Sequence, residues 1–60
     1  MDRAAFDRVA RELLDLLDQQ VAAIVGRDFN DLSKEELEAY RARKGRILEL
    51  RSVLTKLLAA

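Results

Sequence analysis

A basic cluster in the second half of the chain is the feature whose residue types could do chemistry of their own. Four cationic side chains and one tyrosine fall within the run Tyr40-Arg41-Ala42-Arg43-Lys44-Gly45-Arg46, and a further arginine follows at position 51. Positive charge interleaved with an aromatic ring can bind phosphate backbones and stack on bases. The candidate nucleic-acid contacts are therefore Arg41, Arg43, Lys44, Arg46 and Arg51.

The same cluster also has a structural interpretation, which stays open beside the first. Three glutamates, Glu35, Glu36 and Glu38, precede it. Acidic residues early in a helix and basic residues later in it complement the helix dipole. Long arginine and lysine stems also cover the apolar edges of a helical bundle.

Catalytic chemistry finds little support in the residue types. The chain has no His and no Cys, which removes the usual zinc ligand sets, a cysteine nucleophile and disulfides. Its Asp and Glu residues fall mainly on helix faces that are predicted to be solvent-exposed. Acid–base catalysis instead needs carboxylates that are held in a cleft and have separated pKa values. We therefore expect no enzyme activity, no catalytic residue, no metal and no cofactor.

Composition and charge narrow the class of protein further. Among 60 residues, 11 are Lys or Arg and 11 are Asp or Glu, so the net charge is zero. The first half is slightly acidic and the second slightly basic, which suits attraction between helices better than binding to a polyanion. The longest apolar run, from position 21 to 25, is far too short to span a membrane, and the N-terminus lacks a signal-peptide pattern. The expectation is a cytoplasmic protein that does not bind membranes.

Two long helices must position these side chains. Apolar residues recur at three- and four-residue steps, which predicts one helix over about 2–25 and a second over about 34–58, joined by a loop at 26–33. Gly26 follows the last periodic residue, where helices commonly end in a left-handed conformation. Ser33 and Glu36 form a predicted capping box at the start of the second helix. We expect Phe29 to fold back over the end of this single-domain hairpin.

The predicted apolar face is wider than one partner helix can cover. It spans roughly 200° of the first helix, whereas a stripe of about 100° suffices for a surface helix. The residues expected in the core or in a dimer interface are Phe6, Val9, Leu13, Leu16, Leu17, Val21, Ile24, Leu37, Tyr40, Ile47, Leu50, Leu54 and Leu57. With disulfides and zinc removed, oligomerisation is the remaining way to stabilise so short a chain.

Polar side chains interrupt the apolar faces at one level. Gln20 and Arg43 both project into them, and Tyr40 is predicted to lie opposite Gln20. An unpaired buried polar group costs about 1–3 kcal/mol, so these residues should pair or reach the bundle edge. One hypothesis is a polar layer that fixes register and oligomeric state, as in coiled coils. The alternative is that Arg43 extends to water.

The fold class predicted is all-α: an antiparallel helical hairpin that pairs with a second copy to form a four-helix bundle. In topology and size it resembles the Rop class of RNA-binding hairpin dimers, with no shared motif and hence no functional residue to carry over. The leading expectation for function is a homodimerising assembly or adaptor module that binds a protein partner. The alternatives are a nucleic-acid-binding dimer that uses the basic cluster, and a small chaperone or antitoxin-like inhibitor that folds on its target.

Overall fold

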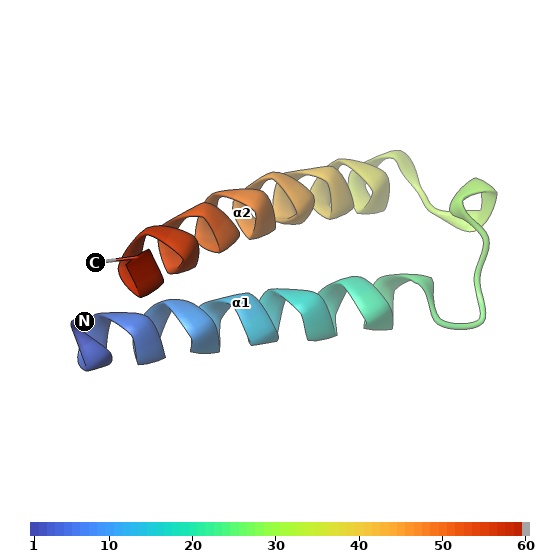
Figure 1. Ribbon diagram of the computed structural model, residues 1–60. Helices are drawn as coiled ribbons and strands as arrows, with labels where there is room; N and C mark the ends of the chain where they lie inside the picture. Colours follow the sequence, from blue (N-terminus) through green and yellow to red (C-terminus); the bar gives the residue numbers. More distant parts are fainter. Residues whose placement is uncertain (60) are drawn as a thin grey trace.

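The chain folds into two long helices that run antiparallel and pack along their length (Figure 1), as seen in a computed structural model that describes residues 1–59. Helix α1 spans Arg3–Ile24, a short 3-10 helix η1 spans Phe29–Asp31, and helix α2 spans Lys34–Ala59. Both termini lie at one end of the hairpin and the loop with η1 lies at the other (Figure 1). The all-helical hairpin predicted from the sequence is confirmed.

Local signals at the helix ends explain where the elements begin and end. Asp2 caps α1 by accepting a hydrogen bond from the backbone N–H of Ala5. The backbone N–H of Glu36 donates to Ser33 Oγ at 3.1 Å, and the backbone N–H of Ser33 donates to Glu36 Oε1 at 3.2 Å. This reciprocal pair confirms the capping box predicted for α2.

The predicted loop contains a turn of helix of its own. Asp28 accepts from the backbone N–H of Asn30, while Asp31 accepts from that of Asp28, so η1 has its own capping box. Phe29 is half exposed, and its ring meets that of Tyr40 edge to face, with centroids 5.3 Å apart. The ring of Tyr40 therefore packs on Phe29 at the loop end of the hairpin.

The two glycines differ in backbone conformation. Gly26 has a φ of 69°, whereas Gly45 sits inside α2 with helical geometry, and a Cβ added at either would meet nothing within 4 Å. Gly26→Ala should therefore lower the free energy of unfolding by about 1–2 kcal/mol, the cost of a left-handed alanine. Gly45→Ala should raise it by up to about 1 kcal/mol. Urea unfolding of both variants checks this, and equal shifts of the same sign would contradict it.

The fold is elongated and has little interior. Its principal extents are 42 × 16 × 14 Å, and its radius of gyration is 13.8 Å, against about 10 Å for a compact domain of this length. Among the described residues, Leu50 is the one buried hydrophobic side chain, with 3% of its surface exposed. The other residues on the line of contact, such as Leu13, Leu16 and Ile47, are half-buried. Two helices thus shield a seam but build no closed core.

Candidate interaction surface

The residues predicted for the core or a dimer interface divide into two groups in the structure. Those on the contact line between α1 and α2 are buried or half-buried: Phe6, Val9, Leu13, Leu16, Ile24, Leu37, Tyr40, Ile47, Leu50, Leu54 and Leu57. Leu17 and Val21 are exposed, by 42% and 57% respectively. Leu14, which was not on the predicted list, is 64% exposed beside them. α1 therefore presents apolar surface that α2 does not reach.

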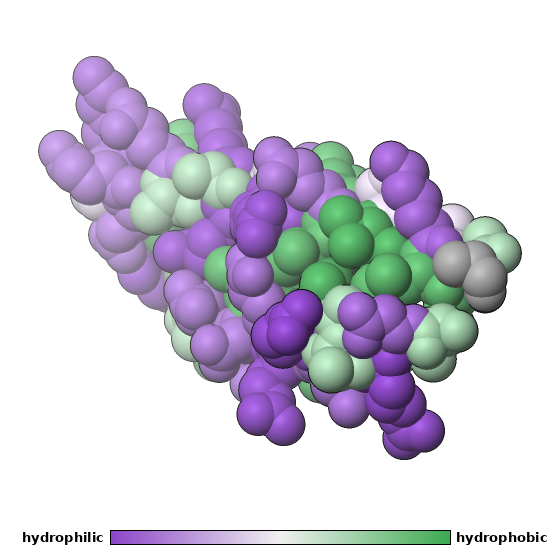
Figure 2. Space-filling model, turned by 90° about the vertical axis from the view of Figure 1, so that its left-hand side faces the viewer, coloured by the Kyte–Doolittle hydropathy of each residue, from purple (hydrophilic) through white to green (hydrophobic). Residues whose placement is uncertain are grey.

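Figure 2 looks onto the end of the hairpin that carries the termini. Hydrophobic side chains form a continuous area in this view, and hydrophilic side chains border it. Met1 and Leu58, both near this end of the molecule, are more than half exposed. Apolar side chains are thus exposed at the terminal end of the hairpin as well as on the flank of α1.

A polar layer crosses the seam where the sequence placed Gln20, Tyr40 and Arg43. Gln20 is only 8% exposed. Its Nε2 donates to the backbone carbonyl of Tyr40 at 3.0 Å, and its Oε1 accepts from Nε of the half-buried Arg43. Tyr40 contributes its backbone carbonyl, which a pattern of side-chain types could not indicate. The side-chain amide of Gln20 thus both donates and accepts a hydrogen bond, and its oxygen holds Arg43 against the seam.

The four arginines and one lysine of the proposed nucleic-acid contact do not form one surface. Arg43 is tied to Gln20. Arg46 binds Glu12 across the seam, with Nε–Oε2 at 2.7 Å, and also Glu49 at 3.1 Å. At about 100° per residue, Arg41, Lys44 and Arg51 lie on the flank of α2 opposite to Arg46. The cluster therefore divides into two parts in the structure. Two arginines bind residues of the hairpin, and the three other cations lie on the opposite flank of α2.

The ion pair of Arg46 with Glu12 was not anticipated. The spacing of charged residues along α1 predicts that Glu12 lies on a solvent-exposed face of the helix, with Arg8 four residues before it. In the structure Glu12 receives two hydrogen bonds from Arg46, which lower the pKa of its carboxyl below the usual value. Only the antiparallel register brings positions 12 and 46 together, so local spacing could not reveal the pair.

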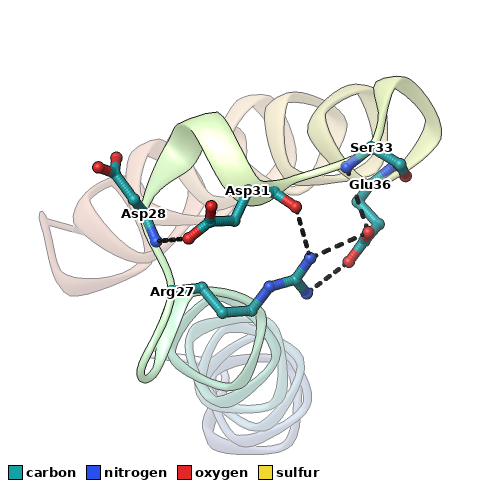
Figure 3. A network of polar contacts seen from close by, with 5 residues as sticks. All are labelled: Arg27, Asp28, Asp31, Ser33 and Glu36. Atoms are coloured by element: carbon teal, nitrogen blue, oxygen red, sulfur yellow. Dashed lines mark hydrogen bonds and ion pairs between the residues drawn. The ribbon is translucent and has the colours of Figure 1, made fainter.

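Arg27 organises the loop end of the hairpin (Figure 3). Its guanidinium donates to both carboxylate oxygens of Glu36, at 2.6 and 3.1 Å, and to the backbone carbonyl of Asp31 at 3.1 Å. Sequence patterns gave no role to Arg27, because Glu36, the partner of its ion pair, lies beyond the loop. The hydrogen bonds from Arg27 and from the backbone of Ser33 lower the pKa of Glu36 from 4.5 to about 2.

The lowered pKa of Glu36 makes the stability of the hairpin depend on pH. In the unfolded chain this carboxyl titrates near its ordinary value, so its stabilising effect is complete above that value and is lost as pH falls toward 2. The melting temperature should therefore fall as pH drops from about 5 to 2. Circular dichroism melts should show a smaller fall for Glu36→Gln than for the control Glu38→Gln. Equal pH dependence in both variants would contradict the role of Glu36.

Comparison of the chain with known protein families, with curated proteins and with solved structures found no match. Within residues 1–59, neither helix is both long and apolar enough to cross a membrane.

Proposed function

We propose that this protein is a non-enzymatic assembly module, which pairs with a second copy of itself as a four-helix bundle and presents a helical surface to a protein partner. The observation that carries this proposal is the unshielded apolar surface of the hairpin. Leu14, Leu17 and Val21 follow one another at helical spacing on α1, and each has 42–64% of its surface exposed. Contiguous exposed apolar residues of this kind typically mark interaction sites.

The total accessible area of the hairpin supports the same proposal. A compact monomer of 6.8 kDa should expose about 3,950 Å², whereas this chain exposes 4635 Å². The excess of roughly 700 Å² is close to the ~800 Å² that each partner buries in a standard protein interface. One second copy would therefore bring the exposed surface of each chain into the ordinary range.

The titratable groups favour a role without catalysis. Exposed arginines lower the pKa values of the Glu12 and Glu36 carboxyls. Catalytic general acids need the opposite, a carboxyl whose pKa is raised by burial. The displaced values here belong to ion pairs that hold the hairpin together.

The alternative of a nucleic-acid-binding dimer has less support from the geometry, because Arg43 and Arg46 are engaged within the hairpin. A gel-shift titration with RNA and DNA at about 50 mM salt separates the two functions. A shift that weakens steeply as salt rises would favour nucleic acid over a protein partner.

Sedimentation velocity of the native chain and two aspartate variants tests the proposed self-association. The native chain should sediment as a dimer at micromolar concentration. Leu17→Asp places a charge on the exposed apolar stripe and should shift the protein to monomer. Ala22→Asp is the matched control, since residue 22 lies on the opposite, exposed side of α1, and it should remain dimeric.

Two results would contradict the proposal. A native chain that is folded as a monomer would rule out the proposed self-association. A native chain that is unfolded as a monomer would favour the alternative of a protein that folds on a different target. Affinity capture from the native source, compared between the native chain and the dimeric Ala22→Asp, then tests the partner-binding half. Absence of any specifically retained protein would argue that the dimer is not an adaptor.

A further inference from the structure

The two flanks of the hairpin differ, because ion pairs between charged side chains cover one of them. With 3.6 residues per turn, Glu12 on α1 and Arg46 on α2 lie about 80° to one side of the seam. They bind each other there, and Glu49 joins them from the next turn of α2. Charged side chains thus cover this flank. A dimer interface that buried it would have to desolvate these ion pairs, which is costly.

The opposite flank of α1 is apolar with a charged edge. Leu14, Leu17 and Val21 lie about 60–120° from the seam on that side, and they are the exposed residues described above. Asp7 and Asp18 lie just beyond them on the same side of the helix, and Arg3 and Arg11 lie near the same angles. The order from the seam outward is therefore apolar and then charged, with both signs present.

The opposite flank of α2 is cationic. The same angular spacing places Lys34, Arg41, Lys44 and Arg51 on this side, together with the exposed Leu48. The glutamates of α2 fall at other angles around the helix. Arg41 and Lys44 line a shallow groove with Phe29, Asn30, Leu37 and Tyr40. The free flank of α2 thus carries cations that can pair with Asp7 and Asp18 on the free flank of α1.

We propose that a second copy of this chain covers the free flank, with α1 of one copy beside α2 of the other and both loops at the same end of the bundle. This inference rests on the proposed self-association and specifies its geometry. The two-fold axis then runs parallel to the helices. Equivalent residues of the two copies therefore lie at the same level along the bundle axis. Neighbouring helices in this bundle are all antiparallel.

The levels of the charged residues support this arrangement. Within one hairpin, Gln20 lies level with Tyr40 and Glu12 with Arg46, as their contacts show. By the same register, Asp18 lies level with Arg41 of the partner subunit, and Asp7 lies near the level of Arg51 of the partner subunit. Each such pair occurs twice in a symmetric dimer. Leu14 lies between the levels of Lys44 and Leu48 of the partner subunit, so it packs on a leucine and a lysine stem.

The competing arrangement brings like charges together. If the two-fold axis were perpendicular to the helices, the loops would lie at opposite ends, and α1 would pair with α1 and α2 with α2. The cationic flank of α2 would then face its own copy. Like charges placed opposite one another across an interface are repulsive and suppress such pairings. The charge distribution therefore selects the first arrangement.

Distance measurement between spin labels tests the proposed geometry directly. Since the chain contains no cysteine, a single Asn30→Cys variant carries one label per copy, at the loop. Dipolar spectroscopy should give an intermolecular distance well below the 42 Å length of the hairpin. A distance near or above 42 Å would place the loops at opposite ends and overturn this inference, while the proposed self-association would stand. Absence of any intermolecular coupling, together with a monomer mass in sedimentation, would overturn both.

Charge reversal provides a second, independent test. Asp18→Lys and Arg41→Glu should each raise the dissociation constant of the dimer on the order of tenfold, because each disrupts two symmetry-related pairs. The double variant should recover most of that loss. The control is Asp15→Lys, which makes the same change on the outer face of α1 and should leave the dissociation constant nearly unchanged. Additive losses in the double variant would contradict the pairing of α1 with α2 of the partner subunit.

Discussion

Replacing Leu50 with alanine should lower the free energy of unfolding by about 2–5 kcal/mol, the range measured for truncation of buried leucines. Leu50 is the most buried hydrophobic residue described in this chain. A folded chain of this length has a total stability of about 3–9 kcal/mol. At the middle of both ranges, the substitution should remove about half of that stability and so raise the unfolded population at room temperature.

Urea unfolding followed by circular dichroism measures this effect, with Leu48→Ala as the control. Residue 48 lies two positions earlier on the same helix, is exposed in the hairpin and should contact the partner subunit mainly at Leu14, so its truncation should cost less. Both substitutions make the same chemical change, hence the difference between them reports burial. Equal losses would mean that Leu50 is not the centre of the seam.

Replacing Gln20 with leucine should cost about 1–3 kcal/mol, because it leaves the half-buried guanidinium of Arg43 without its hydrogen-bond acceptor. The backbone carbonyl of Tyr40 also loses a donor. Removing both members of the pair, in Gln20→Leu/Arg43→Leu, should restore most of the lost stability, since two apolar groups leave nothing unpaired.

A double-mutant cycle in urea measures this coupling. Gln19→Leu, at the neighbouring exposed position, is the control for the change in helix propensity and should alter stability by only a few tenths of a kcal/mol. If the double variant were less stable than Gln20→Leu alone, the polar layer would not be a paired unit. If Gln20→Leu also left the oligomeric state unchanged, the layer would contribute stability without fixing the register.

The features of the fold that were predictable from sequence are those with local causes. The spacing of apolar residues indicates both helices, Gly26 marks the left-handed end of the first, and Ser33 with Glu36 forms the cap of the second. Each of these signals involves residues within about one turn of each other. The antiparallel register follows from the short loop, and this is why Gln20 could be placed opposite Tyr40.

The features that sequence patterns missed depend on contacts between distant positions. Glu12 binds Arg46 rather than a neighbour on its own helix, and Arg27 binds Glu36 across the loop. The basic cluster was read as one group because its members are adjacent in sequence. The helical rotation sends Arg46 to the flank opposite Arg41 and Lys44, so adjacency along the chain did not predict a common surface.

The concentration dependence of thermal unfolding tests the central claim, that the hairpin is completed by a second copy. If folding is coupled to dimerisation, mass action requires the melting temperature to rise with protein concentration. Melts of the native chain over roughly a hundredfold range of micromolar concentration should therefore shift upward, with a dimer mass before unfolding. A fully helical monomer whose melting temperature does not change over that range would contradict the claim.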